Sequence, residues 1–266
     1  MSTESKELEQ LEDKTFIFHL TIPLADINLE YHHVFNHLQQ DFTTKGFRKG
    51  KAPADLVKSQ ISDEKIIDEI LSLILNRLYR QKTGEYKLKP IIQPQIKIVN
   101  QPLTLDKDWQ VEITACEKPD IDLDPKHIAA ISQLNQSKPK DHTKELINTL
   151  LKFTTIKLPP ILINSDLNNR LSQLVDQTTQ AGITVSQYLK SKNLTLEQYQ
   201  QDQANLIASE WTINLLIDQI ASAQKIEIKA EELDAYLKTH PELANQRHLV
   251  YFVLLQDKVF AYLKSL

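Results

Sequence analysis

Residues 45–53 read Lys45-Gly46-Phe47-Arg48-Lys49-Gly50-Lys51-Ala52-Pro53, and the organisation of the whole chain can be worked out from this stretch. The protein has only 4 glycines in 266 residues, and two of them, Gly46 and Gly50, lie here. Glycine is favoured where the backbone turns tightly or takes a positive φ. Pro53 closes the stretch and restricts the preceding residue to extended geometry. The pattern therefore predicts a loop of defined shape.

The side chains of this loop combine one large apolar ring with several cations. Phe47 lies among Lys45, Arg48, Lys49 and Lys51. Cations attract an anionic surface and make the affinity depend on salt, and a ring on a fixed loop can serve as a buried anchor. The loop is thus a candidate docking site. The alternative is that Phe47 packs into the protein's own core while the charged side chains are merely solvated.

Residues 46–53 resemble the ribosome-docking loop of trigger factor, the bacterial chaperone that meets nascent chains at the ribosomal tunnel exit. That family carries the motif Gly-Phe-Arg-x-Gly-Lys-x-Pro at the tip of its N-terminal domain, and every specified position is matched here. The resemblance implies an ATP-independent chaperone that docks on the large ribosomal subunit and holds nascent or unfolded polypeptide segments.

The resemblance also implies a role for each residue of the loop. Phe47 would be the buried anchor, and Arg48 and Lys49 would pair with rRNA phosphates or acidic side chains of a large-subunit protein. The glycines and the proline would set the shape and exit of the loop, and the other two lysines would add attraction that salt screens. The predicted ribosome-binding residues are Lys45, Gly46, Phe47, Arg48, Lys49, Gly50, Lys51 and Pro53.

Composition is that of a soluble globular protein, with 41% apolar and 25% charged residues. The net charge of -4 means that anion binding must come from a local patch, and residues 45–58 are the clearest one. A single cysteine, Cys116, excludes an internal disulfide and fits a reducing compartment. Residues 1–12 show no secretory signal pattern, and no run of about 18 apolar residues exists. We therefore expect a cytoplasmic protein without a membrane span.

Hydrophobic periodicity predicts a small α+β domain with an antiparallel sheet over residues 1–118. Phe16, Phe18 and Leu20 alternate as on a strand, after a start at residues 1–13 that we expect to be frayed. The predicted elements are strands at 15–22, 94–101 and 109–117 and helices at 26–42, 53–60 and 62–82.

Capping signals bound the longest predicted helix of this domain. Ser62 is suited to its N-cap, with two acidic residues following, and Gly84 is suited to ending it. Ser62 and Lys65 also match the bare Ser-x-x-Lys pattern of some acyl enzymes, but the companion motifs are missing. The capping interpretation accounts for every residue of the stretch.

The remainder of the chain divides into a linker and a helical domain. Residues 119–143 carry prolines and spaced aspartates, which indicates a polar linker. Residues 144–266 show helical apolar spacing almost throughout, and Thr184 and Thr195 each begin a capping box with a glutamine three residues later. The helices predicted here cover about 144–153, 161–180, a short one after 184, 195–224, 230–238 and 241–266.

The likeness to trigger factor extends beyond the loop. The strand-helix-strand order of residues 14–118 is that of its N-terminal domain, and residues 158–163 and 186–189 are loosely similar to the opening of its helical C-terminal domain. Between 119 and 144 there is no room for the family's prolyl-isomerase domain. The resemblance therefore implies a short form without isomerase activity.

No enzyme or cofactor motif stands out in the sequence. The 8 histidines include none in a His-Glu-x-x-His pattern, none pairs with cysteine at zinc spacing, and no glycine-rich nucleotide loop is present. We expect no catalytic residue, no metal and no cofactor.

Two other function classes remain open at the level of sequence. The protein could be an RNA- or protein-binding adaptor that docks through the same basic loop without holding clients. The helical part alone would also suit a periplasmic chaperone of the SurA type, although the missing signal pattern and the basic loop oppose this. Client preference and oligomeric state have no signature in the sequence.

Overall fold

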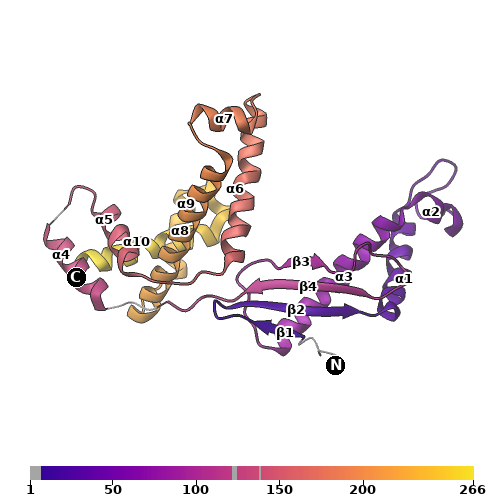
Figure 1. Cartoon of the computed structure of the whole chain (residues 1–266), viewed down its shortest axis with the longest axis horizontal. Coiled ribbons are helices and arrows are strands. Elements are labelled where there is room, and N and C mark those ends of the chain that lie inside the picture. Colours follow the sequence, from indigo (N-terminus) through magenta and orange to yellow (C-terminus); the bar gives the residue numbers. More distant parts are fainter. Residues whose placement is uncertain (1–6, 122–124, 138) are drawn as a thin grey trace. The chain divides into compact units, whose positions relative to one another are not determined.

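The computed structural model describes residues 7–121, 125–137 and 139–266 and divides the chain into two compact units, Met1–Lys118 and Pro119–Leu266. The first unit is an α+β fold with an antiparallel sheet, and the second is built of helices (Figure 1). The predicted fold class is therefore confirmed. No helix in these described ranges is long and apolar enough to cross a bilayer.

The sheet of the first unit has four strands in the order β1-β2-β4-β3, and each neighbouring pair is antiparallel. Its strands are β1 (Leu8–Gln10), β2 (Thr15–Ile22), β3 (Gln95–Ile98) and β4 (Trp109–Cys116). The expectation of a frayed start at residues 1–13 was wrong for β1, which pairs Leu8 with Phe18 and Gln10 with Phe16, and its part at residues 1–6 lies outside the described residues. A strand of three residues is too short to show an alternating apolar pattern, so sequence alone does not predict it. It forms because it pairs with β2.

Three helices complete the first unit: α1 (Leu24–Asp41), α2 (Ala54–Gln60) and α3 (Asp63–Glu85). Ser62 caps α3 as predicted, since its hydroxyl accepts from the backbone N–H of Lys65. Gly84 does not end this helix and lies inside it. The end is set by Lys87, which has φ 55° and donates to Gly84, while Leu88 donates to the carbonyl of Thr83. This is a Schellman arrangement with lysine in the left-handed position.

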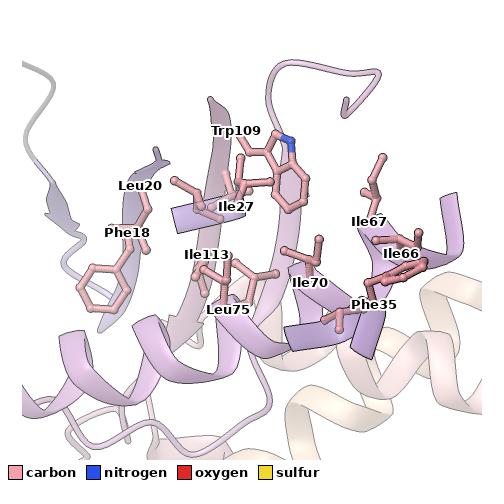
Figure 2. Packing of buried hydrophobic residues seen from close by; sticks show 14 of the residues in the cluster. Phe18, Leu20, Ile27, Phe35, Ile66, Ile67, Ile70, Leu75, Trp109 and Ile113 are labelled. Carbon is pink, nitrogen blue, oxygen red and sulfur yellow. The ribbon is translucent and has the colours of Figure 1, made fainter. Parts of the chain in front are cut away.

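The core of the first unit lies between one face of the sheet and helices α1 and α3 (Figure 2). Alternate residues of β2 and β4, including Phe18 and Ile113, face helical residues such as Ile27 and Ile70. Trp109 is fully buried, and its indole N–H donates to the carbonyl of Thr104 at 2.7 Å. This packing fixes the ends of α1 and α2, between which the loop of interest runs.

The second unit contains α4 (Pro125–Ser137), α5 (His142–Phe153), α6 (Pro160–Gln180), α7 (Val185–Ser191), α8 (Leu196–Gln224), α9 (Ala230–Thr239), the 3-10 helix η1 (Pro241–Gln246) and α10 (Arg247–Ser265). Both predicted capping boxes are present, at Thr184 and at Thr195. The final predicted helix is divided, because η1 precedes α10.

Much of the segment expected to be a linker, 119–143, is helix α4. The prolines of this segment indicate a linker, but Pro125 is the first residue of the helix, a position that proline favours. Ile131 is fully buried in the core of the second unit. His127 is also buried, with its Nε2 atom 3.0 Å from the hydroxyl of Thr154. Tertiary packing thus makes a helix of a segment whose composition suggested a connection.

Helix α8 supplies more of the buried core of the second unit than any other helix. Leu216, Ile217 and Ile220 are fully or almost fully buried, together with residues of α4, α5 and α10. Trp211 in the middle of this helix is half-buried, and its indole N–H donates to Asp166 of α6 at 2.8 Å. Helices α5, α6, α7 and α10 all pack against this long helix.

Candidate functional site

Residues 42–53 connect α1 to α2 and project at the end of these two helices (Figure 1). We call this segment the glycine loop. It contains all eight residues that the sequence singled out as a docking site. Lys45, Gly46, Phe47, Arg48, Lys49, Lys51 and Pro53 are exposed, and Gly50 is half-buried.

Both glycines of the loop have backbone angles that other residues rarely adopt. Gly46 has φ +91° and Gly50 has φ +73°. Gly50 also approaches α1 closely, because a Cβ atom placed on it would lie 2.7 Å from the carbonyl oxygen of Gln40. Its backbone N–H donates to the carbonyl of Phe42 at 3.0 Å. The segment that returns from the loop tip therefore packs against the C-terminal end of α1, as the glycine pattern predicts.

The C-terminal end of the loop is held by a side chain of α1. The amide Nε2 of Gln39 on α1 donates to the carbonyl oxygen of Ala52 at 3.0 Å. Ala52 is only 2% exposed and belongs to the core of the first unit. Pro53 then occupies the N-cap of α2, where its carbonyl accepts from Val57. Two hydrogen bonds, Gly50 to Phe42 and Gln39 to Ala52, thus fix both sides of the loop base, and we call them the loop clamp.

Phe47 presents its ring to solvent at the far end of the loop. Its side chain is 43% exposed and is absent from the hydrophobic core of the first unit. Its backbone N–H donates to Thr44 at 3.3 Å, and Lys51 donates to Arg48 at 3.0 Å, so the tip is turned on itself. The alternative in which Phe47 packs into the protein's own core is therefore not what the structure shows. A ring left in water on a clamped loop is free to enter a partner's surface.

The charges of the loop are unequal. Lys49 forms an ion pair with Asp41, with 2.8 Å between Nζ and Oδ1. The hydrogen bond and the positive charge of Lys49 hold the pKa of the Asp41 carboxyl below its ordinary value. Within the described part of the chain, Lys45, Arg48 and Lys51 make no ion pair. Three of the four cations are thus free to meet an external anion, and the fourth has an internal partner.

Sequence reasoning missed the α1 residues that contact the loop. Gln39 and Asp41 lie in the last turn of α1, outside the motif. One signal was available for Asp41, because a carboxylate at a helix C-terminus is electrostatically unfavourable and calls for a compensating cation. Gln39 had no such signal, since only the folded loop brings Ala52 to its amide.

A second candidate surface lies in the helical unit, between α5, α8 and residues 154–158. Two adjoining hollows of about 460 and 480 Å³ share Leu151 and Ser209 in their walls, and we call them together the α5–α8 groove. Leu206 in its wall is 47% exposed. Glu210 is the carboxylate in the lining and is paired with Arg170 of α6. Other lining residues are Ile147, Ile156, Ile163, Thr212, Asn214 and Gln256.

No group of three or more metal-ligating side chains comes together among the residues that the structure describes. The single cysteine is fully buried on β4, and burial raises the pKa of the Cys116 thiol to about 12. A thiol in this state is a poor nucleophile near neutral pH.

Comparison with known families covers nearly all of the first unit and extends into the second. The family model described as "Bacterial trigger factor protein (TF)" matches residues 4–150, more than half of the chain. The chain belongs to the trigger factor family. The model described as "Bacterial trigger factor protein (TF) C-terminus" matches residues 129–247. The two trigger factor matches overlap at 129–150, so one passes directly into the other.

Individual trigger factors are similar to this chain over part of their length. The trigger factor of Bdellovibrio bacteriovorus is 28% identical over 116 residues, which are 44% of this chain and 26% of that protein. The trigger factor of Mycobacterium avium is 23% identical over 150 residues, which are 56% of this chain and 32% of that protein. The chain therefore spans about a quarter to a third of the curated relatives that it matches.

A solved trigger factor structure shares the fold. The chain described under "Promiscuous Substrate Recognition in Folding and Assembly Activities of the Trigger Factor Chaperone" is 12% identical and superposes with a TM-score of 0.61. The alignment covers 97% of this chain and 99% of that one. The α+β unit and the helical unit together thus follow a trigger factor arrangement of elements along the chain.

Proposed function

We propose that this chain is an ATP-independent chaperone that docks beside the tunnel exit of the large ribosomal subunit and holds nascent or unfolded segments. The observation that carries the proposal is the exposed ring of Phe47 on a clamped loop of the family's docking motif. We further propose that it acts in the cytoplasm and that Phe47, Arg48 and Lys49 are the central docking residues.

The chemistry of the glycine loop suits a surface of rRNA and protein. Arg48, Lys45 and Lys51 are exposed cations without internal ion pairs in the described chain, and each can approach a phosphate or a carboxylate. Exposed ion pairs contribute little individually, about 0–1 kcal/mol. A buried aromatic anchor can contribute 2 kcal/mol or more. The ring should therefore supply most of the affinity, and the cations its salt dependence.

The α5–α8 groove suits the holding of unfolded segments. Its lining combines aliphatic side chains with hydroxyl and amide groups, and its carboxylate Glu210 forms an ion pair with Arg170. A surface of this kind can bury an apolar side chain without demanding a particular charge pattern. We propose the groove as one client-holding surface.

Co-sedimentation with 70S ribosomes over a salt series tests the docking. We expect the protein to pellet with ribosomes at low salt and to be released as salt rises. A variant with Phe47, Arg48 and Lys49 all changed to Ala should remain in the supernatant. A matched control changes Lys65, Leu73 and Arg80 of α3 to Ala, which also removes one exposed apolar side chain and two cations. Equal behaviour of the two variants would refute the loop as the docking site.

Suppression of aggregation tests the holding activity independently of the ribosome. We expect this protein to keep a chemically unfolded substrate in solution when present at about stoichiometric ratio. A protein that binds ribosomes through the loop and does not suppress aggregation would instead be the docking adaptor.

We also propose that the chain lacks prolyl-isomerase activity, because the two family matches leave no residues between them for that domain. Refolding of a substrate limited by proline isomerisation should proceed at the uncatalysed rate in its presence. Acceleration of the slow phase would contradict this part of the proposal.

A further inference from the structure

Asp41 occupies an unfavourable position that its neighbours compensate. It is the last residue of α1, whose last turn holds no basic residue. The C-terminal end of a helix carries partial negative charge, so a carboxylate there is repelled. The ion pair with Lys49, 2.8 Å long, offsets this repulsion, and His37 lies 3.9 Å from the other carboxylate oxygen. An unfavourable local choice of this kind calls for a reason beyond helix stability.

The partner of Asp41 is one of the cations that the docking motif supplies. Lys49 lies between Arg48 and Gly50, and its ammonium is turned back to α1 by the ion pair. In the free protein, Asp41 therefore cancels one of the four positive charges of the loop. A phosphate that approaches Lys49 must share its ammonium with this carboxylate or displace it.

The shape of the loop does not depend on this ion pair. Its base is held by the loop clamp, which consists of Gly50 donating to Phe42 and Gln39 donating to Ala52. The positive φ of each glycine supplies the turns. Loss of the Asp41 carboxylate would thus leave the loop in place and free the ammonium of Lys49.

We propose that Asp41 limits the affinity of the glycine loop for its anionic docking surface by competing for Lys49. The inference rests on the proposed function, in that the surface is ribosomal. Asp41 keeps docking weaker and less sensitive to salt than the four cations of the motif would make it.

Asp41→Asn tests the proposal, since asparagine keeps the size of the side chain and removes its charge. We expect the variant to bind 70S ribosomes two- to fivefold more tightly than the wild type at about 0.1 M salt, where exposed charges act over about 10 Å. The slope of log affinity against log salt should steepen by about one phosphate contact. Affinity equal to or below that of the wild type would overturn the proposal.

Asp26→Asn is the matched control. Asp26 is an exposed carboxylate in the first turn of the same helix, so its loss changes the net charge equally. Fifteen residues of helix place it roughly 22 Å along the axis from Asp41, beyond the screening length. We expect its affinity to stay within about 1.5-fold of the wild type. An equal gain in both variants would mean that total charge matters and the Lys49 pair does not.

Carboxyl NMR titration of the free protein tests the ion pair without any ribosome. The pKa of Asp41 should lie below its ordinary value in the wild type and return toward that value in Lys49→Ala. An Asp41 pKa that Lys49→Ala leaves unchanged would overturn the proposal. Failure of the wild type itself to bind ribosomes would be a different result, because it would refute the proposed function and remove the inference with it.

Discussion

The glycine loop and the α5–α8 groove expose apolar side chains to solvent in opposite ways. In the loop, a single ring, Phe47, stands on a backbone fixed by two positive-φ glycines and the loop clamp. In the groove, aliphatic side chains from α5, α8 and the segment after α5 line a broad hollow that no glycine shapes. One surface is defined by backbone geometry, and the other by composition.

This difference explains why the two surfaces leave different traces in the sequence. A loop that must present one ring at one angle needs particular residues at particular positions, and these form a motif. A groove that accepts many segments needs only apolar residues at helical spacing, and many sequences satisfy this. Docking should therefore be sensitive to single substitutions in the loop, while holding should be insensitive to them in the groove. The predictions below test this contrast, from the largest expected effect to the smallest.

The largest effects should come from the cores that support the two surfaces. Ile70→Ala in the first unit and Leu216→Ala in the second each remove a fully buried aliphatic side chain. Each should lower the free energy of unfolding of its own unit by about 2–5 kcal/mol. The chain has two tryptophans, Trp109 and Trp211, one in each unit. Replacing either by Phe leaves fluorescence that reports the unfolding of the other unit.

The single thiol gives a second measurement of the first unit. Burial raises the pKa of Cys116 to about 12, so a thiol reagent at pH 8 should react with it only after the unit opens. Ile70→Ala should therefore speed the reaction, and Leu216→Ala should leave its rate nearly unchanged. Equal acceleration by both variants would show that the two units unfold together. The loop and the groove could then not be compared as surfaces on independently stable units.

The core that these variants probe was largely predictable. Phe16, Phe18 and Leu20 alternate along the chain and are buried together on one face of the sheet. Ser62 and Thr195 begin helices as their capping patterns require. These features are local, since each depends on residues within a few positions of one another.

The features that sequence could not supply depend on distant residues. Strand β1 is stabilised by pairing with β2, and α4 is stabilised by the burial of Ile131 in the core of the second unit. In the candidate site, the sequence motif identified the glycines and the basic residues of the loop. The partnership of Asp41 with Lys49 and of Gln39 with Ala52 became visible only when the loop folded back on α1.

Phe47→Ala should separate docking from stability most clearly. Phe47 is 43% exposed and lies outside the hydrophobic core, so loss of its ring should lower the free energy of unfolding by about 1 kcal/mol or less, against about 3–5 kcal/mol for a buried Phe. Its loss should weaken ribosome binding by about 2 kcal/mol, or roughly 30-fold, because anchor residues carry most of an interface's affinity. Leu73→Ala is the control, since Leu73 is 51% exposed on α3 outside the loop. Similar ribosome affinities for the two variants would refute Phe47 as the docking anchor.

The two loop glycines should differ from each other. Alanine at either position is strained by the positive φ, at a cost of roughly 1–2 kcal/mol. Gly50→Ala should cost more than Gly46→Ala, because its new Cβ would meet the carbonyl of Gln40 at 2.7 Å while that of Gly46 meets nothing within 4 Å. Denaturant unfolding followed by Trp109 fluorescence in a Trp211→Phe background measures both. A larger cost for Gly46→Ala would contradict the clamped base of the loop.

The smallest effect should follow substitution in the groove. Leu206→Ser removes an apolar side chain that is 47% exposed in the groove wall, and Leu196→Ser removes one that is 48% exposed at the start of the same helix, outside the groove lining. We expect Leu206→Ser to reduce aggregation suppression by no more than about twofold and Leu196→Ser to leave it unchanged, since a leucine that is half-exposed contributes only part of the 1.5–3 kcal/mol of full burial. Light scattering of a shared unfolded substrate compares the two. A tenfold loss in Leu206→Ser would give the groove a hot spot of its own, and the contrast between a surface defined by geometry and one defined by composition would fail.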